Sequence, residues 1–241
     1  MSVNQNRATN KPSFLKEPLP KGKIIDITIP LSQFTPVYPG DPNPSLKKVS
    51  SLEKAGFAVT SLSFGSHTGT HIDAQTHVFE NGKSSEQIDL ATLMGKALLL
   101  DFSSKHGAIS AETLNTALEK IKRSALSNEI SILLLKTKKA NKVSETQGIN
   151  AFSDSCWLGK EAATLLVKKG FKTVGVDAFS LDAPASKKLP IHKLLLSNFI
   201  NIVECLDLRA VKEGLYYFLC LPLKIEACDG APARALLIVE A

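Results

Sequence analysis

The chain has 241 residues, of which 44% are apolar, and a formal net charge of +6 at pH 7. This length and composition allow one sizeable core, and a single domain is expected because mixed α/β domains often reach this size undivided. The lysines are scattered without a basic stripe or interleaved aromatic residues, and no apolar run approaches the roughly 18 residues of a membrane span, so neither nucleic acid nor a membrane is expected as a partner.

The first 22 residues are expected to be a disordered tail. They are rich in Asn, Lys, Pro and Ser and hold no apolar segment of the kind found in secretory signals. The four cysteines lie far apart and form no Cys-x-x-Cys pair. We therefore expect small buried thiols in a reducing, cytoplasmic environment and not a disulfide framework. Residues 23–241 are predicted to form the single domain.

Several short segments, with alternating polarity or apolar runs, predict strands. In chain order these are 23–31, 57–64, 96–102, 130–137, 173–178, 202–206, 216–225 and 234–239. After the first of them, residues 35–44 hold four prolines and a glycine, which predict a stiff, non-helical loop because proline fixes φ and removes a donor. Helical spacing predicts helices over 110–126, 159–169 and 192–199, the second ended by Gly170. The sequence predicts a β-rich α/β domain with few helices.

Three of the five histidines fall within eleven residues, at His67, His71 and His77, with Asp73 among them. All four positions are odd-numbered, so an extended backbone would project these side chains to one side, and Gly69 would leave space between them. A single histidine in a strand is more often structural, but four potential ligands of shared parity are much less expected by chance. The segment predicts a site for Zn²⁺, Mn²⁺ or Fe²⁺, since a divalent cation accepts neutral imidazole and carboxylate lone pairs.

Further ligands are expected from elsewhere, because one strand rarely surrounds an ion. His192, at the start of a predicted helix, and Glu204, in an apolar strand, are the candidates. A glutamate in such a strand is costly to bury unless it is paired or bound to a cation. For each of the two, a structural role remains an equal alternative. Asp177 is a weaker candidate, and His106 is excluded because it reads as part of a surface turn.

The histidine segment resembles the hallmark of the cyclase family, which includes bacterial kynurenine formamidases, isatin hydrolases and proteins named polyketide cyclases. That hallmark is His-x-Gly-Thr-His-x-Asp-x-Pro-x-His, and residues 67–77 match it everywhere except at Gln75, where the family has proline. Other stretches that resemble the family are 26–31, 38–42, 175–182, 221–224 and 229–234. The resemblance therefore runs from about residue 23 to the end of the chain.

The resemblance implies a swivelling β/β/α fold and a homodimer or homotetramer. It also implies one or two ions of Zn²⁺ or Mn²⁺, with His77 within catalytic reach. The residues implied as ligands are His67, His71 and Asp73 for one ion, and Asp73, His192 and Glu204 for a second. Gln75 in place of proline would loosen the turn between Asp73 and His77 while leaving every ligand type in place.

The working hypothesis is hydrolysis of an amide, either an N-formyl aryl amide or a related cyclic amide, by metal-activated water. His77 is the candidate proton shuttle, and His192 is the alternative if it is not a ligand. Phe64, Phe79 and Trp157 could form a wall for an aromatic ring, although core packing is the better interpretation of each. Two rival hypotheses are a metal-binding or ligand-sensing protein without turnover, and a cyclase or dehydratase acting on a polyketide-like substrate.

Overall fold

The structure is a computed structural model that describes residues 19–125, 130–137, 156–184 and 186–240. Most of the predicted tail therefore lies outside the described residues. The strands are β1 (Gly22–Asp26), β2 (Ser45–Ser50), β3 (Val59–Ser63), β4 (His71–Asp73), β5 (Met94–Asp101), β6 (Ala108–Ile109), β7 (Ile132–Lys136), β8 (Trp157–Leu158), β9 (Thr173–Val176), β10 (Asn201–Glu204), β11 (Gly214–Pro222) and β12 (Gly230–Glu240). The helices are α1 (Leu52–Ala55), α2 (Ala111–Ala125), α4 (Lys160–Lys169) and α5 (Pro190–Ser197), with 3-10 turns η1 (Gln75–His77), η2 (Ser85–Gln87) and η3 (Leu90–Leu93).

One mixed sheet, in the strand order β1-β12-β11-β5-β7-β9-β10-β4, forms the centre of the molecule. The sheet closes on itself because β4 pairs with β12 as well as with β10, so every one of these strands except β1 belongs to a ring. The neighbours β5, β7, β9 and β10 run parallel to one another, and the other pairings are antiparallel. The expected β-rich mixed sheet with few helices is thus confirmed, and it is curved into a barrel.

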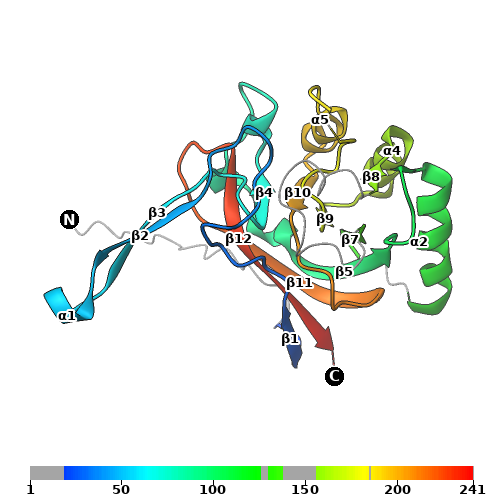
Figure 1. Ribbon diagram of the computed structural model, residues 1–241. Helices are drawn as coiled ribbons and strands as arrows, with labels where there is room; N and C mark the ends of the chain where they lie inside the picture. The colour runs from blue at the N-terminus through cyan, green and yellow to red at the C-terminus, as the bar shows by residue number, and fades with distance from the viewer. Residues whose placement is uncertain (1–18, 126–129, 138–155, 185, 241) are drawn as a thin grey trace, which may run out of the picture.

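Alternation along the strands divides the apolar core in two, since successive side chains point to opposite faces. Ile72, Leu134 and Phe218 come from strands around the ring and are buried together in its interior. Leu133 and Ile202 point outward, where they pack with residues of α2, α4 and α5. These three helices lie on the same side of the sheet (Figure 1). The ring therefore has an inner core and an outer, helix-covered core.

The predicted elements agree with these bounds to within a few residues, with one informative exception. The helix predicted over 159–169 is α4, and Gly170 ends it with a left-handed backbone at φ 77°. The strand predicted over 23–31 stops at Asp26, whose Oδ1 accepts a hydrogen bond from the Thr28 backbone at 3.1 Å. Thr28 then pairs with Leu206 in an isolated bridge, while its hydroxyl still bonds to the backbone of Ala235 in β12. The turn at Asp26 divides what the sequence pattern presented as one strand.

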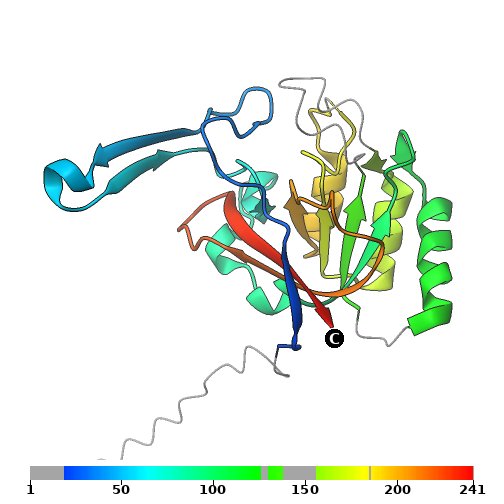
Figure 2. The same ribbon diagram turned by 60° about the horizontal axis from the view of Figure 1, so that its bottom comes forward.

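The hairpin of β2 and β3, with α1 at its tip, extends away from the ring in both views (Figure 1, Figure 2). It forms a separate two-stranded sheet. Its large apolar side chains are exposed, namely Leu46, Val49, Leu52, Phe57, Val59 and Leu62. β3 confirms the strand predicted over 57–64, whereas β2 was missed because its sequence, SLKKVS, has neither an apolar run nor regular alternation. Of the helices in the described ranges, none combines the length and the apolar character that a bilayer crossing would require.

Candidate metal centre

The short strand β4 places His71 and Asp73 on the outer face of the ring. Ile72, between them, points into the interior core, so its two neighbours must point the other way. β10 runs antiparallel to β4 with Glu204 opposite His71, which puts this carboxylate on the same face. Glu204 Oε2 lies 3.8 Å from His71 Nε2. The pairing of β4 with β10 therefore brings together residues that are far apart in the sequence.

The helix α5 adds His192 from the outer layer, next to β10 (Figure 1). His192 Nε2 lies 3.1 Å from Asp73 Oδ2 and 3.2 Å from Glu204 Oε1. Its Nδ1 lies 2.7 Å from Asp182 Oδ2. The Asp182 carboxylate also accepts the backbone N–H groups of Ile191 and His192 at 3.0 and 3.1 Å, so it caps the first turn of α5. The Asp182 carboxylate thus holds both the first turn of α5 and the imidazole ring of His192.

His67 and His77 reach the site through turns and not through the extended backbone that their shared parity predicted. Only His71–Asp73 is a strand; His67 lies in a turn before it and His77 in the 3-10 turn η1 after it. Gly69 has φ 68°, and a Cβ there would lie 2.8 Å from Leu31 Cδ2. Glycine is required at 69 by a left-handed turn against Leu31, not by the space around an ion. The convergence was predicted, but the reason given for it was wrong.

Asp229 is a member of the cluster that the sequence reasoning did not assign. Its Oδ2 lies 3.3 Å from His67 Nε2 and 4.0 Å from His77 Nδ1. Ser66 Oγ donates a hydrogen bond to Asp229 Oδ1 at 2.8 Å. The next residue, Gly230, pairs with Asp73 across β4 and β12, and a Cβ there would lie 2.7 Å from His67 Cε1. The Asp-Gly pair at the start of β12 was the sequence feature that could have identified Asp229, because it places a carboxylate next to a residue that must lack a side chain.

Each of the three most enclosed imidazoles has its outward nitrogen held by an oxygen. The acceptors are the Gly69 carbonyl for His71 Nδ1 at 2.8 Å, Asp182 for His192 Nδ1 and Asp229 for His67 Nε2. The opposite nitrogens face Asp73, whose Oδ1 lies 2.9 Å from His67 Nδ1 and 3.3 Å from His71 Nε2. Oxygen acceptors behind histidine rings are the usual outer shell of protein metal sites, where they fix the ring's tautomer and orientation.

The donor set fits a divalent cation. Asp73 Oδ2 is buried and has no hydrogen-bond partner in the described part of the protein, although His192 Nε2 lies close to it. A buried carboxylate oxygen left without a hydrogen bond is costly unless something else compensates its charge. Three groups of side chains have ligand atoms within 4.8 Å of one another, namely His67, His71 and Asp73; Asp73, His77 and His192; and His67, His77 and Asp229. His67, His77 and Asp73 each belong to two of these groups, and Asp73 is the most buried of the three.

Carboxylates around the imidazoles determine where protons bind when no cation is present. Burial lowers the pKa of His67, but hydrogen bonds with Asp229 and Asp73 outweigh it and raise this pKa to about 9. Burial would raise the pKa of Asp73, yet the surrounding imidazoles hold it well below its ordinary value. Protons and a cation therefore compete for the same nitrogen atoms.

His77 differs from the other histidines of the cluster in its electrostatics. Burial lowers its pKa below the ordinary 6.5, and repulsion from the rings of His67 and His192 adds to this, while attraction to Asp73 opposes it. Its ring centroid lies 4.2 Å from that of His67 and 5.7 Å from that of His192. At neutral pH His77 is therefore an uncharged imidazole at the edge of a charged cluster.

The cluster is closed at one end and open at the other. The side chains of Asp73, His71, His192 and Glu204 are at most 5% exposed. Those of His67, His77 and Asp229 are 17%, 25% and 47% exposed. A small molecule therefore meets His67, His77 and Asp229 first.

The remaining sequence candidates lie outside this cluster. Asp177 Oδ1 accepts hydrogen bonds from the backbone and hydroxyl of Thr137 at 2.8 and 2.7 Å, which is a structural role. Phe79 packs against the outer core. Trp157 lies in β8, and His106 is exposed in a loop, as expected.

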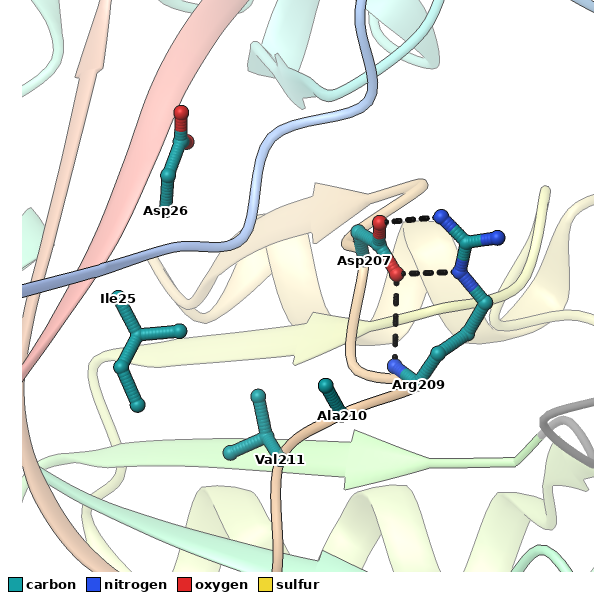
Figure 3. Close-up of a pocket in the computed structure, with 6 residues that line it drawn as sticks. All are labelled: Ile25, Asp26, Asp207, Arg209, Ala210 and Val211. Carbon is teal, nitrogen blue, oxygen red and sulfur yellow. Dashed lines mark hydrogen bonds and ion pairs between the residues drawn. The ribbon is translucent and has the colours of Figure 1, made fainter.

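A separate pocket of about 390 Å³ is lined by Ile25, Asp26, Asp207, Arg209, Ala210 and Val211 (Figure 3). Its charges are paired within the protein. Arg209 Nε and Nη2 donate to the two oxygens of Asp207 at 2.7 and 2.6 Å. Asp26 accepts from Arg234 Nε at 3.1 Å. None of the cluster residues lines this pocket and its charged groups are neutralised, so the histidine cluster is the candidate functional site.

Comparisons with known proteins identify the family of this chain. Residues 25–183 match the model of the Cyclase family. The kynurenine formamidase of Bacillus mycoides (strain KBAB4) is 33% identical over 214 residues, which are 88% of this chain and 96% of that protein. A solved structure described as a predicted metal-dependent hydrolase from Bacillus stearothermophilus is 28% identical, with a TM-score of 0.67 over 90% of this chain and 98% of the other.

An isatin hydrolase bound to the product analogue thioisatinate shares the fold, with a TM-score of 0.78 at 20% identity over 91% of this chain and 93% of the other. At this identity the likeness concerns the fold alone. The family match covers more than half of the chain, and the formamidase relative aligns along nearly all of its own length. The described ring of strands with its cluster of histidines and acids thus belongs to a member of the cyclase family.

Proposed function

We propose that this protein is a metal-dependent amide hydrolase that acts on aryl formamides, with N-formylkynurenine as the first candidate substrate and isatin-like cyclic amides as the second. The observation that carries the proposal is the buried Asp73, whose Oδ2 has no hydrogen-bond partner among the described residues while three oriented imidazoles surround its carboxylate. The names of the relatives support the choice of substrate class, since they include kynurenine formamidases and an isatin hydrolase.

One cation would be held by His67, His71 and Asp73, and a second by Asp73, His192 and Glu204. Zn²⁺ and Mn²⁺ both suit this mixture of imidazole and carboxylate ligands. When bound, such a cation supplies Lewis-acid chemistry, because it polarises a carbonyl group and lowers the pKa of water. The contribution of the chain is to hold the ligands in their tautomers through Asp182, Asp229 and the Gly69 carbonyl.

His77 is assigned the proton transfer. Both nitrogens of His192 are committed, one to Asp182 and the other toward Asp73 and Glu204, which supports a ligand role for His192. His77, by contrast, has no carboxylate within 3.5 Å of its ring nitrogens among the described residues, and its lowered pKa leaves it neutral at pH 7. A neutral imidazole at the open edge of the site can take a proton from water and return it to the leaving amine.

The proposal is tested by incubating purified, zinc- or manganese-loaded protein with N-formylkynurenine, isatin and simple aryl formamides, and by identifying products by mass spectrometry. We expect formate or ring-opened product to appear at a rate that falls to background in the His71→Ala, Asp73→Ala double variant. His106→Ala is the matched control, since it removes an exposed histidine outside the cluster and is expected to retain full activity.

Two results would overturn the proposal. If the double variant keeps the activity of the parent protein, the cluster is not the active site. If the loaded protein binds members of the panel but converts none of them, the protein is a sensor and not a hydrolase. Cyclised or dehydrated products in place of formate would identify a different reaction at the same site.

A further inference from the structure

Gln75 makes two side-chain hydrogen bonds that join separate segments. Its amide Nε2 donates to the carbonyl oxygen of Leu196 at 2.7 Å, and its Oε1 accepts the backbone N–H of Lys83 at 3.1 Å. Leu196 lies in the last turn of α5, and its carbonyl oxygen also accepts the backbone N–H of Phe199 at 3.1 Å, so Gln75 is a second donor at this helix end. The side chain thus bridges the end of α5 and the chain that returns from η1.

The two segments joined by Gln75 carry the two histidines whose relative position matters most. η1 consists of Gln75–His77, and α5 carries His192 one turn before Leu196. The backbone of the turn is closed at Thr76, whose N–H donates to the Lys83 carbonyl at 3.2 Å. Apolar packing also joins the two segments, since Phe79 packs on the same outer core as Leu196.

The packing around Gln75 leaves it little freedom. A Cβ on Gly82 would lie 2.6 Å from Gln75 Cβ and 2.8 Å from the backbone nitrogen of Thr76, so only glycine fits there. The Gly82 backbone therefore packs directly against the base of the Gln75 side chain, and the amide at the other end donates a hydrogen bond to the end of α5. A side chain placed in this way fixes a distance and does not merely fill space.

We propose that Gln75 is a positioning residue whose amide ties the turn bearing His77 to the helix bearing His192. In this role it sets the place of the proton-transferring ring relative to the ligand cluster. The catalytic consequence rests on the proposed function; the tether itself does not. Displacements of about 1 Å at a reacting group can reduce a rate by up to a hundredfold, so a tether of this kind has a measurable effect.

Three substitutions separate the tether from the stiffness of the turn. Gln75→Ala removes both hydrogen bonds. Gln75→Glu keeps the shape and the acceptor for the Lys83 N–H but removes the donor to the Leu196 carbonyl. Gln75→Pro stiffens the turn without either bond, and the backbone tolerates it, since position 75 is the first residue of η1 and Ala74 before it is extended at φ −95°, ψ 165°. Gln87→Ala is the matched control, because the side-chain oxygen of Gln87 accepts a local hydrogen bond from the backbone N–H of Ser84, at the start of η2, and does not join two distant segments among the described residues.

The first measurement is amide hydrogen exchange on the metal-loaded protein without substrate, followed by mass spectrometry of peptides that cover residues 75–83 and 190–197. We expect exchange to rise about two- to tenfold in both segments for Gln75→Ala, and at the end of α5 alone for Gln75→Glu, which keeps the acceptor for the Lys83 N–H. Gln75→Pro should protect the turn at Gln75–His77 and still expose Lys83 and the end of α5. Exchange that stays unchanged at the end of α5 in all three variants would overturn the tether, whatever the substrate is.

The second measurement is the division between kcat and KM on the substrate found for the parent protein. We expect kcat per folded molecule to fall about tenfold for Gln75→Ala and Gln75→Glu, with KM and bound metal nearly unchanged, and no effect for Gln87→Ala. A merely structural role would lower the melting temperature and leave kcat per folded molecule intact, and that result contradicts positioning. If the parent protein hydrolyses nothing, the proposed function fails, while the exchange experiment still decides the tether.

Discussion

Asp182 offers the sharpest test of how the ligand cluster is held. It is buried, and its two oxygens accept three donors, namely the N–H of Ile191, the N–H of His192 and Nδ1 of the His192 ring. In Asp182→Asn the NH₂ group cannot accept. In one orientation the amide leaves the Ile191 N–H without an acceptor. In the other it leaves both the N–H and the Nδ1 of His192 without one. No orientation of the new side chain satisfies all three.

The expected loss follows from these contacts. A buried donor left without an acceptor costs about 1–3 kcal/mol, so the free energy of unfolding of the metal-free protein should fall by that amount. Removing an outer-shell partner of a ligating histidine typically weakens metal binding by about 10–100-fold, which is about 1.4–2.8 kcal/mol. We expect the lower value if the amide oxygen still faces His192 and the higher one if it does not.

The assay is competition for Zn²⁺ or Mn²⁺ between the protein and a chromophoric chelator, with urea unfolding of the metal-free protein in parallel. Asp207→Asn is the control, because it also neutralises a hydrogen-bonded carboxylate but one that is paired with Arg209 in the separate pocket. If Asp182→Asn binds the ion as tightly as the parent protein does, His192 is not a ligand or its orientation does not depend on Asp182, and the reasoning is refuted.

Three further predictions follow from the cluster. His77→Ala should lower kcat by about 10²–10⁴-fold while the bound metal stays at the parent level; loss of metal in this variant would make His77 a ligand. Gly230→Ala places a Cβ 2.7 Å from His67 Cε1 and 2.9 Å from the Ile72 carbonyl oxygen, so thermal or urea unfolding should reveal a destabilisation of about 1–3 kcal/mol, and an unchanged stability would contradict the close fit. In the metal-free protein the pKa of His67 is raised from 6.5 to about 9, so its stabilising contribution is complete below pH 6.5 and is lost as the pH rises through 9. Thermal unfolding in the presence of a chelator should accordingly give a melting temperature that falls over this range, and one that rises would show that the proton on His67 does not stabilise the fold.

Much of the fold could be predicted from local patterns. The strands of the ring carry apolar runs or alternation, and α4 ends at the glycine that the sequence marks. The closure of the ring could not be predicted, because β4 is only three residues long and its partners β10 and β12 come more than a hundred residues later. Pairings over such separations leave no mark in the local sequence.

The sequence predicted most of the residues in the candidate site but not the backbone turns that bring them together. The density of histidines near Asp73 was sufficient to indicate that they gather, and Glu204 stood out as a carboxylate in an apolar strand. The turn at Gly69 and the 3-10 turn at His77 could not be distinguished from an extended chain by parity alone, since several backbone paths bring alternate residues together. Asp182 acts on His192 from a distant loop, and an aspartate in a loop is too common to indicate such a role, whereas for Asp229 the glycine that follows it was the one available signal.

The unequal enclosure of the cluster sets an order of events. Asp73 and Glu204 lie behind His67 and His77, and the exposed side chains are all at one end. A metal ion that exchanges with solvent and an organic molecule that binds would then both enter past His67, His77 and Asp229. A ligand bound at these three residues would slow the release of the ion, so a chelator should remove the metal more slowly when such a ligand is present. Metal release and ligand binding would in this way be linked because they share one opening.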